Sequence, residues 1–387
     1  MSYEYINEDI EKYIIEMRRH FHENPELSWE EVETSKRILK ELEDMGIEAR
    51  QVAKTGVLGI LNKDKDGSVL AIRADIDALP VQEENSLDFV SKNDGVMHAC
   101  GHDAHAAMLL GAAKAMALNK DKVGKVVFLF QPAEEFIKQS GAQLVVDENV
   151  LKDENVDRIL AIHVWNPLEA GKVALQEGPI MASADTFKIE IIGKGGHGAQ
   201  PQQTIDPITI GTLIVENLQH LVSRENSPIN PMVLSVTAFN SGNSENVIPE
   251  RAELLGTTRT FDNVKRETFP EIMERVIKGI VEANRGEYKF TYYKGTPATI
   301  NEAASVEMGR KVVGEIIGEE NIVYQDPQMG GEDFAKYLMD IPGCLMFLGA
   351  KIPNQDAPHH NPKFMIEEDT MKTGAEYFVK YAMEYVK

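Results

Sequence analysis

Histidines are unevenly distributed along this chain of 387 residues, and most of them fall in three short stretches. Seven of the ten belong to these stretches, which hold His20 and His22, then His98, His102 and His105, and finally His359 and His360. Histidine is the commonest metal ligand and the side chain that most readily changes charge near neutral pH. This grouping predicts metal binding or acid–base chemistry.

The densest stretch, residues 97–105, reads Met-His-Ala-Cys-Gly-His-Asp-Ala-His. Its Cys100 and His102 are close enough for one loop to supply a thiolate and an imidazole to the same cation. The alternative for an isolated Cys100 is a small buried apolar residue, and only the other candidate ligands argue against it. His98 and His105 flank the pair, and we expect them to support the ligands rather than bind metal.

Further candidates follow short apolar runs that are typical of buried strands. Glu134 and Glu135 come soon after the run 126–130, and His163 comes directly after 159–162. In an open α/β sheet, ligands bind just beyond the carboxyl ends of the strands. The positions therefore predict one shared site, although an acidic pair by itself would more often be a solvated loop.

A second acidic pair, Asp75 and Asp77, follows the apolar run 69–74. At a metal site such carboxylates orient a liganding imidazole through a hydrogen bond. Capping of the strand end is an equally good explanation of the same pattern.

The elements that would position these residues alternate between helix and strand. The spacing of apolar residues over 10–21 predicts an N-terminal helix, and a second helix is expected to open at Ser28, with Glu31 completing a capping box, and to stop at Gly46. Apolar strand runs then alternate with helical segments such as 104–118. This order predicts an α/β fold with an open, mostly parallel sheet and helices on both faces.

From about Phe187 the pattern changes to half-exposed strands and two helices in the order βαββαβ, which predicts an inserted ferredoxin-like α+β domain. We expect residues 1–184 to form the first part of a catalytic metal-binding domain and 296–387 its second part. Residues 185–295 would be an inserted domain that serves as a lid or in dimerisation.

Composition narrows the class of protein. The formal net charge of -22 argues against nucleic acid as a partner, because such binding needs a basic surface. The N-terminal residues lack the features of a signal peptide, and no apolar run is long enough for a membrane span. The two cysteines give no disulfide framework. We therefore expect a cytoplasmic enzyme with no membrane partner.

Taken together, these motifs resemble the M20 family of metallopeptidases and aminoacylases, in its amidohydrolase branch of N-acyl amino acid, hippurate and indole-acetyl amino acid hydrolases. They run in family order over almost the whole chain. The matching stretches are 18–28 (RRHFHENPELS), 73–80 (RADIDALP), 97–105 (MHACGHDAH), 131–135 (QPAEE), 195–198 (GGHG), 330–334 (GGEDF) and 359–362 (HHNP). Many M20 peptidases have His-x-Asp and a bridging Asp where this chain has Asp75-x-Asp77 and Cys100, which favours the amidohydrolase branch.

The resemblance implies a site for two divalent metal ions, with zinc, manganese, cobalt and nickel all compatible with the ligands. Cys100 would bridge the two ions. His102 and His163 would complete one coordination sphere, and Glu135 and His360 the other. Glu134 would be the general base that deprotonates a metal-bridging water, and Asp75 and Asp77 would support the ligands.

The resemblance also suggests that His197 crosses to the site of a neighbouring subunit and helps to stabilise the oxyanion, in a homodimer or higher homo-oligomer. The alternative interpretation of His197 is a histidine in a turn with no catalytic role. Arg259 and, more weakly, Asn246 are candidates for binding the substrate carboxylate, and a surface strand charge explains Arg259 equally well.

The expected reaction is metal-dependent hydrolysis of the amide bond of a small-molecule N-acyl amino acid. The alternatives are a specific N-acetyldiaminopimelate deacetylase, a dipeptidase, or a catalytically inactive metal-binding or small-molecule-binding protein with the same fold.

Overall fold

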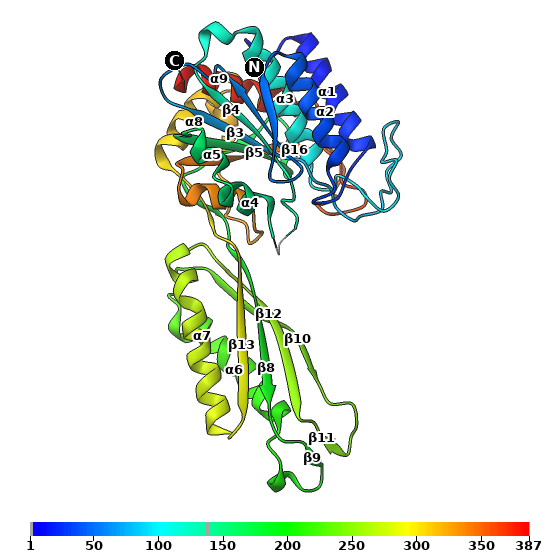
Figure 1. The fold of residues 1–387 in the computed structure, drawn as a ribbon, viewed down its shortest axis with the longest axis vertical. Helices are drawn as coiled ribbons and strands as arrows, with labels where there is room; N and C mark the ends of the chain where they lie inside the picture. The colour runs from blue at the N-terminus through cyan, green and yellow to red at the C-terminus, as the bar shows by residue number, and fades with distance from the viewer. Residues whose placement is uncertain (1–2, 137–138, 387) are drawn as a thin grey trace. The chain divides into compact units, whose positions relative to one another are not determined.

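The computed structural model describes residues 3–136 and 139–386, and the chain divides into two compact units. The first unit comprises Met1–Gly178, Ile300–Asp326 and Asp333–Lys387, and the second comprises Pro179–Thr299 and Pro327–Glu332 (Figure 1). The domain roles and boundaries expected from the sequence stay predictions.

An eight-stranded mixed sheet forms the centre of the first unit, in the order β1-β2-β4-β3-β5-β16-β6-β15. Its four middle strands, β4, β3, β5 and β16, are mutually parallel. Both β3 and β4 are buried along their whole length, which explains their almost uninterrupted apolar sequences. The strands are β1 (Glu48–Val52), β2 (Gly56–Leu61), β3 (Leu70–Asp75), β4 (Val126–Gln131), β5 (Arg158–Glu169), β6 (Val173–Ala174), β15 (Ile322–Val323) and β16 (Gly343–Lys351).

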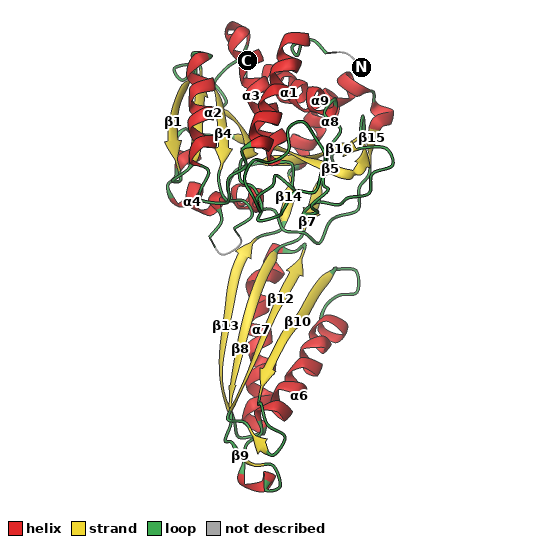
Figure 2. Cartoon of the chain, turned by 90° about the vertical axis from the view of Figure 1, so that its right-hand side faces the viewer, coloured by secondary structure: helices red, strands yellow, loops and turns green. Residues whose placement is uncertain are grey.

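Helices cover both faces of this sheet, so the predicted fold class is confirmed (Figure 2). The first set is α1 (Glu8–Glu23), α2 (Val32–Asp44), α3 (His102–Leu118), α8 (Ala303–Ile317) and α9 (Thr370–Tyr385). All five contribute to one apolar core with the sheet. The short helices α4 (Gly141–Asp147) and α5 (Val150–Asp153) lie on the opposite face. Because α3 is buried on nearly every side, it is apolar all round apart from its first turn and Lys114.

The predicted start of the second helix was wrong. The structure begins α2 at Val32, and neither Ser28 nor Glu31 forms the expected capping box. The Ser28 hydroxyl instead donates to Asp77 Oδ2 at 2.7 Å, and the Glu31 carboxylate turns inward to accept a hydrogen bond from Thr55. Partners far away in the sequence therefore compete successfully with local capping.

The second unit contains a four-stranded antiparallel sheet in the order β10-β12-β8-β13. Two helices pack against it through a core that includes Phe187, Ile214 and Met273. This confirms the predicted ferredoxin-like βαββαβ arrangement. In chain order the elements are β8 (Ala184–Ile192), α6 (Pro207–His220), β10 (Met232–Ser241), β12 (Arg251–Thr260), α7 (Asn263–Ala283) and β13 (Glu287–Thr296).

Smaller elements complete the two units. The strands β9 (Gly196–His197) and β11 (Val247–Ile248) pair in the second unit, and β7 (Gly178–Met181) and β14 (Thr299–Asn301) lie where the chain passes between units. Among the described residues, every helix is too short or too polar to cross a bilayer.

Candidate metal centre

The five predicted ligands come from four separate parts of the first unit, and the structure brings them together. Glu135 follows β4, and His163 lies within β5. Cys100 and His102 lie at the start of α3, and His360 belongs to the segment between β16 and α9. The site is therefore built around the carboxyl ends of the parallel strands, as expected for an open α/β sheet.

Two groups of potential ligands share Cys100. In the first, the ligand atoms of Cys100, His102 and His163 lie within 4.8 Å of one another, and the sulfur is 3.6 Å from His163 Nε2. In the second, Cys100 is grouped in the same way with Glu135 and His360. His360 Nε2 lies 3.2 Å from Glu135 Oε1. The thiol thus belongs to two three-residue groups at once.

Backbone geometry makes this sharing possible. Gly101, between Cys100 and His102, has a φ of +90°, a conformation that favours glycine. A Cβ atom there would lie 2.3 Å from a methyl group of Val164. His360 also has a positive φ, of +64°, and its backbone N–H donates to the oxygen of Ala99 at 2.8 Å. That bond ties the His360 segment to the Cys100 loop.

In each imidazole of the first group, Nδ1 contacts a backbone oxygen and Nε2 is the nitrogen that could bind a cation. His102 Nδ1 lies 2.9 Å from the backbone oxygen of Asp77, and His163 Nδ1 lies 2.7 Å from that of Val164. His102 Nε2 is buried and has no hydrogen-bond partner in the described structure. Buried polar atoms are rarely left unpaired, so a cation bound at this nitrogen fits the geometry.

The electrostatics of the second group also fit a cation. Burial raises the pKa of the Cys100 thiol, and the Glu135 carboxylate raises it further. Hydrogen bonds to Cys100 and then to Glu135 raise the pKa of His360 to about 10. The protein alone thus keeps protons on its sulfur and imidazole, whereas a divalent cation would replace them and stabilise the thiolate. The sulfur, nitrogen and oxygen donors suit the transition metals expected from the sequence.

Asp75 and Asp77 lie beneath these ligands and are both buried. Asp75 Oδ1 is 2.5 Å from His105 Nδ1, and its other oxygen accepts from Arg73 at 2.6 Å. Asp77 Oδ1 is 3.3 Å from His102 Nδ1. These contacts agree with the prediction that the two carboxylates orient imidazoles, and the nearest acceptor to His102 Nδ1 is the backbone oxygen of Asp77 rather than its carboxylate.

Glu134 is half-buried beside the ligand groups. Its carboxylate, that of Glu135 and a ring nitrogen of His102 lie within 4.8 Å of one another. Oε1 of Glu134 accepts from the backbone N–H of Asp333 at 3.4 Å. The adjacent residues Glu134 and Glu135 thus place both carboxylates at the site, and of the two only Glu135 is grouped with Cys100.

A buried network that the sequence reasoning missed supports this loop. Arg73 Nη2 donates to Asp333 Oδ1 at 2.8 Å, and Arg73 Nε donates to Gln131 Oε1 at the same distance. All three side chains are almost completely buried. The available signal was the presence of Arg73 and Gln131 in strand sequences that are otherwise apolar.

A second missed network lies behind His102. Asp103 Oδ2 is 3.0 Å from Arg18 Nε and 2.7 Å from His22 Nδ1, which joins α1 to the first turn of α3. The sequence grouped His22 with the other clustered histidines but gave no partner for it. His98 is buried nearby, and both of its ring nitrogens lack a hydrogen-bond partner among the described residues.

Aromatic rings pack against one side of the centre. The ring of His163 lies 5.8 Å from Trp165 and 5.3 Å from His359, measured between centroids. Phe347 stacks on Trp165 at 4.6 Å. Apolar surroundings of this kind lower the local dielectric and strengthen electrostatic interactions within the site.

The remaining predicted residues belong to the second unit. His197 lies on β9 and is exposed, and its strand partner is Val247, next to Asn246. Arg259 lies near the end of β12, where its guanidinium donates to the backbone oxygen of Thr258 at 2.9 Å. His197 and Asn246 are therefore neighbours within this unit, and the roles of all three residues stay predictions.

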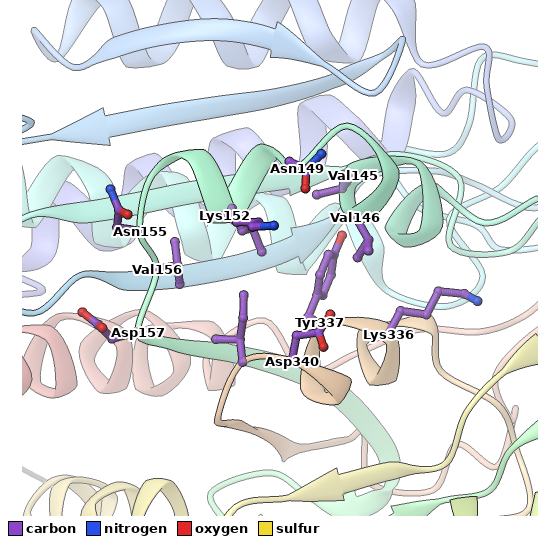
Figure 3. A pocket seen from close by; sticks show the side chains of 12 residues that line it. Val145, Val146, Asn149, Lys152, Asn155, Val156, Asp157, Lys336, Tyr337 and Asp340 are labelled. Carbon is purple, nitrogen blue, oxygen red and sulfur yellow. The ribbon is translucent and has the colours of Figure 1, made fainter.

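The first unit also contains a cavity of about 600 Å³ between α4, α5 and residues 336–341 (Figure 3). Its walls include Val146, Lys152 and Tyr337, and none of the predicted site residues contributes to them. We therefore assign the chemistry to the ligand groups around Cys100 and not to this cavity.

An α/β sheet with a group of Cys, His and Glu side chains at its carboxyl edge, and with the Glu134 carboxylate beside that group, fits a metal-dependent amidohydrolase. The model of Peptidase family M20/M25/M40 matches residues 71–384. The chain belongs to this family.

Relatives with assigned activities agree with the amidohydrolase branch. An N-acyl-L-amino acid amidohydrolase from Geobacillus stearothermophilus is 48% identical over 296 residues, which cover 76% of this chain and 79% of that protein. An N-acetylcysteine deacetylase from Bacillus subtilis is 41% identical, with 96% of each chain covered. The crystal structure of Bacillus subtilis YxeP, described as a dinuclear metal binding peptidase from the M20 family, has a TM-score of 0.86 at 38% identity, covering 98% of this chain and 99% of the other.

Proposed function

We propose that the protein hydrolyses the amide bond of N-acyl amino acids and releases an amino acid and a carboxylic acid. The observation that carries this proposal is the sharing of Cys100 between two ligand groups, with the carboxylate of Glu134 beside them. The similarity to an N-acyl-L-amino acid amidohydrolase over three quarters of the chain supports the same substrate class.

Five residues would hold two divalent metal ions: Cys100 between them, His102 and His163 on one side, Glu135 and His360 on the other. Zinc, manganese, cobalt or nickel would suit these ligands. When bound, such ions supply Lewis-acid polarisation of the scissile carbonyl and lower the pKa of water. The dinuclear description of YxeP supports a count of two.

Glu134 would perform the proton transfers. Its carboxylate would accept a proton from the attacking water and then deliver that proton to the departing amide nitrogen. The backbone N–H of Asp333, which donates to Glu134 Oε1, would help to hold the carboxylate in place for this exchange. Asp77 would meanwhile hold the imidazole of His102 in place through Nδ1.

The second unit would contribute substrate-binding groups as a lid or dimerisation domain. Arg259 has the planar geometry that matches a carboxylate, and Asn246 would assist it. His197 is exposed on its short strand, so it is available to act at the site of a neighbouring subunit in a homodimer, where it would stabilise the oxyanion.

A panel of N-acetyl, N-benzoyl and N-indoleacetyl amino acids, with N-acetyldiaminopimelate and dipeptides included, tests the proposal on metal-loaded protein. Release of free amino acid from the N-acyl substrates, absent in Glu134→Gln, is the expected result. Preference for N-acetyldiaminopimelate or for dipeptides would favour those narrower activities. No release from any substrate, in protein shown to contain metal, would favour a catalytically inactive binding protein.

A further inference from the structure

The turn between β4 and the acidic pair has an unusual backbone. β4 ends at Gln131, and two residues later Ala133 has a φ of +49°. Residues other than glycine rarely adopt this conformation, because their Cβ atom is crowded by the backbone. The turn must therefore be held by its surroundings, and it directly precedes Glu134 and Glu135.

Two buried carboxylates hold the turn on either side of Glu134. The backbone N–H of Ala133 donates to Glu31 Oε1 at 2.8 Å, and the backbone N–H of Glu135 donates to Asp77 Oδ2 at 3.0 Å. The backbone N–H groups of the residues before and after Glu134 are thus each held by a carboxyl group from a different segment.

Glu31 is well suited to this task because its own position is fixed. Its side chain has no exposed surface, and its second oxygen accepts from the Thr55 hydroxyl at 2.6 Å. The residue stands directly before α2, and its backbone oxygen accepts from the N–H of Ser35 at 3.1 Å. Burying a carboxylate is costly unless its oxygens are hydrogen-bonded, so its presence beneath the turn calls for a specific role.

We infer that Glu31 is a positioning residue that acts through the backbone of Ala133 to set the placement of the Glu134 carboxylate over the ligand groups. This inference rests on the proposed function, in which Glu134 transfers the proton. Loss of the acceptor would leave the Ala133 N–H buried and unpaired, and the turn would relax towards a negative φ. Small misplacements of a reacting group, of about 1 Å, can reduce turnover by roughly 100-fold.

The matched pair Glu31→Leu and Glu31→Gln tests this role. Both variants keep a side chain of similar size, but only glutamine keeps an oxygen for the Ala133 N–H. Thr55→Val is the control, because it removes the other hydrogen bond of Glu31 and leaves the bond to Ala133 possible. The measurements are kcat and KM on the best substrate of the panel, metal content, and thermal unfolding.

For Glu31→Leu we expect kcat to fall at least about tenfold with KM within about twofold of wild type and the metal retained. Glu31→Gln and Thr55→Val should keep kcat within about threefold of wild type. Equal losses in Glu31→Leu and Thr55→Val, or an unchanged kcat in Glu31→Leu, would overturn the inference while leaving the proposed function intact. If Glu31→Leu does not fold, Glu31→Asp, whose shorter chain cannot reach Ala133, takes its place with the same expectation.

A crystal structure of Glu31→Leu gives a readout that does not depend on turnover. We expect residues 133–135 to leave the conformation seen here, whereas Glu31→Gln should preserve it. An unchanged turn in Glu31→Leu would overturn the inference, whether or not the wild-type protein hydrolyses a substrate of the panel. A lack of hydrolysis by the wild-type protein would by itself reject only the proposed function.

Discussion

The Nδ1 atom of His102 lies 2.9 Å from the backbone oxygen of Asp77 and 3.3 Å from one of its carboxylate oxygens. This contact fixes the orientation of the imidazole and leaves Nε2, which has no hydrogen-bond partner among the described residues and lies 3.8 Å from Asp75 Oδ2, as the candidate ligand atom. The same carboxylate accepts the backbone N–H of Glu135 through its other oxygen. Asp77 therefore links a residue from each of the two ligand groups.

Replacing Asp77 with alanine should weaken metal binding about 10- to 100-fold, the range found when a group that orients a metal ligand is removed. Titration of metal-free protein with zinc or manganese measures the change. Ser28→Ala is the control, because it removes only a donor to Asp77 and should leave metal affinity within a few-fold of wild type. Equal affinities for wild type and Asp77→Ala would contradict the role given to this carboxylate.

Glu134→Gln should retain both metal ions and lose at least about 100-fold in kcat, since an amide cannot accept the proton from water. Its size and its bond to the Asp333 backbone are preserved, so KM should change little. Steady-state kinetics with metal analysis of the same sample check this. Turnover near that of wild type would overturn the assignment of the general base.

The sequence was sufficient to predict that most of these side chains would lie close together, because four of the five are tied to recognisable elements. Glu135 and His163 are tied to buried strands, and Cys100 and His102 lie at the start of a long, mostly apolar helix. The sheet limits the direction of a side chain that lies just after a strand. The position of such a residue along the chain therefore already implies its place in space. The ferredoxin-like unit was predictable for a similar reason, because its strands alternate between buried and half-exposed residues.

Long-range polar contacts could not be predicted in the same way. Arg73 and Asp333 are 260 residues apart in sequence, and their 2.8 Å bond depends on the packing of β3 against the segment before β16. Glu31 matched a local capping pattern, but its partners Thr55 and Ala133 come from other elements. A local motif and a buried tertiary contact use the same residue types, and only the folded chain decides between them.

Cys100→Ser should lower the metal content of purified protein after dialysis from two ions per chain, because one soft ligand that serves both groups is replaced by a weakly acidic hydroxyl. Cys344→Ser is the matched control. Cys344 is also buried, but its sulfur lies 3.9 Å from the hydroxyl of Tyr377, and it is not part of either ligand group. Metal loss in both variants, or in neither, would argue against Cys100 as the shared ligand.

If sites are shared between subunits, mixing His197→Ala with Glu134→Gln should restore activity that neither variant has alone. In a mixed dimer one site would combine an intact Glu134 with the partner's intact histidine. Random exchange of subunits produces mixed dimers as half of the population, and each mixed dimer has one intact site out of two. About one quarter of wild-type activity is therefore expected. Mixing Glu134→Gln with Cys100→Ser should restore nothing, because both changes lie in the first unit. No recovery with exchange confirmed would exclude sharing.

The stability of the metal-free protein should depend on pH through Glu31. Burial, and next the Asp77 carboxylate, raise the pKa of Glu31 to about 7 from an ordinary value of 4.5. Between pH 4.5 and pH 7 the folded state thus keeps a proton on Glu31 that the unfolded state releases. The stabilisation is complete below pH 4.5 and is lost as pH rises through 7, which amounts to about 3 kcal/mol.

Glu31→Gln carries no such proton, so its free energy of unfolding relative to wild type should rise by about 3 kcal/mol between pH 4.5 and 8. Urea unfolding of chelator-treated protein at the two pH values measures this difference. Glu33→Gln changes an exposed carboxylate in the first turn of the same helix, and its difference from wild type should stay nearly constant. If Glu31→Gln behaves like Glu33→Gln, the carboxyl group of Glu31 ionises in the folded protein as it does in water, and the buried environment described here would not hold it protonated.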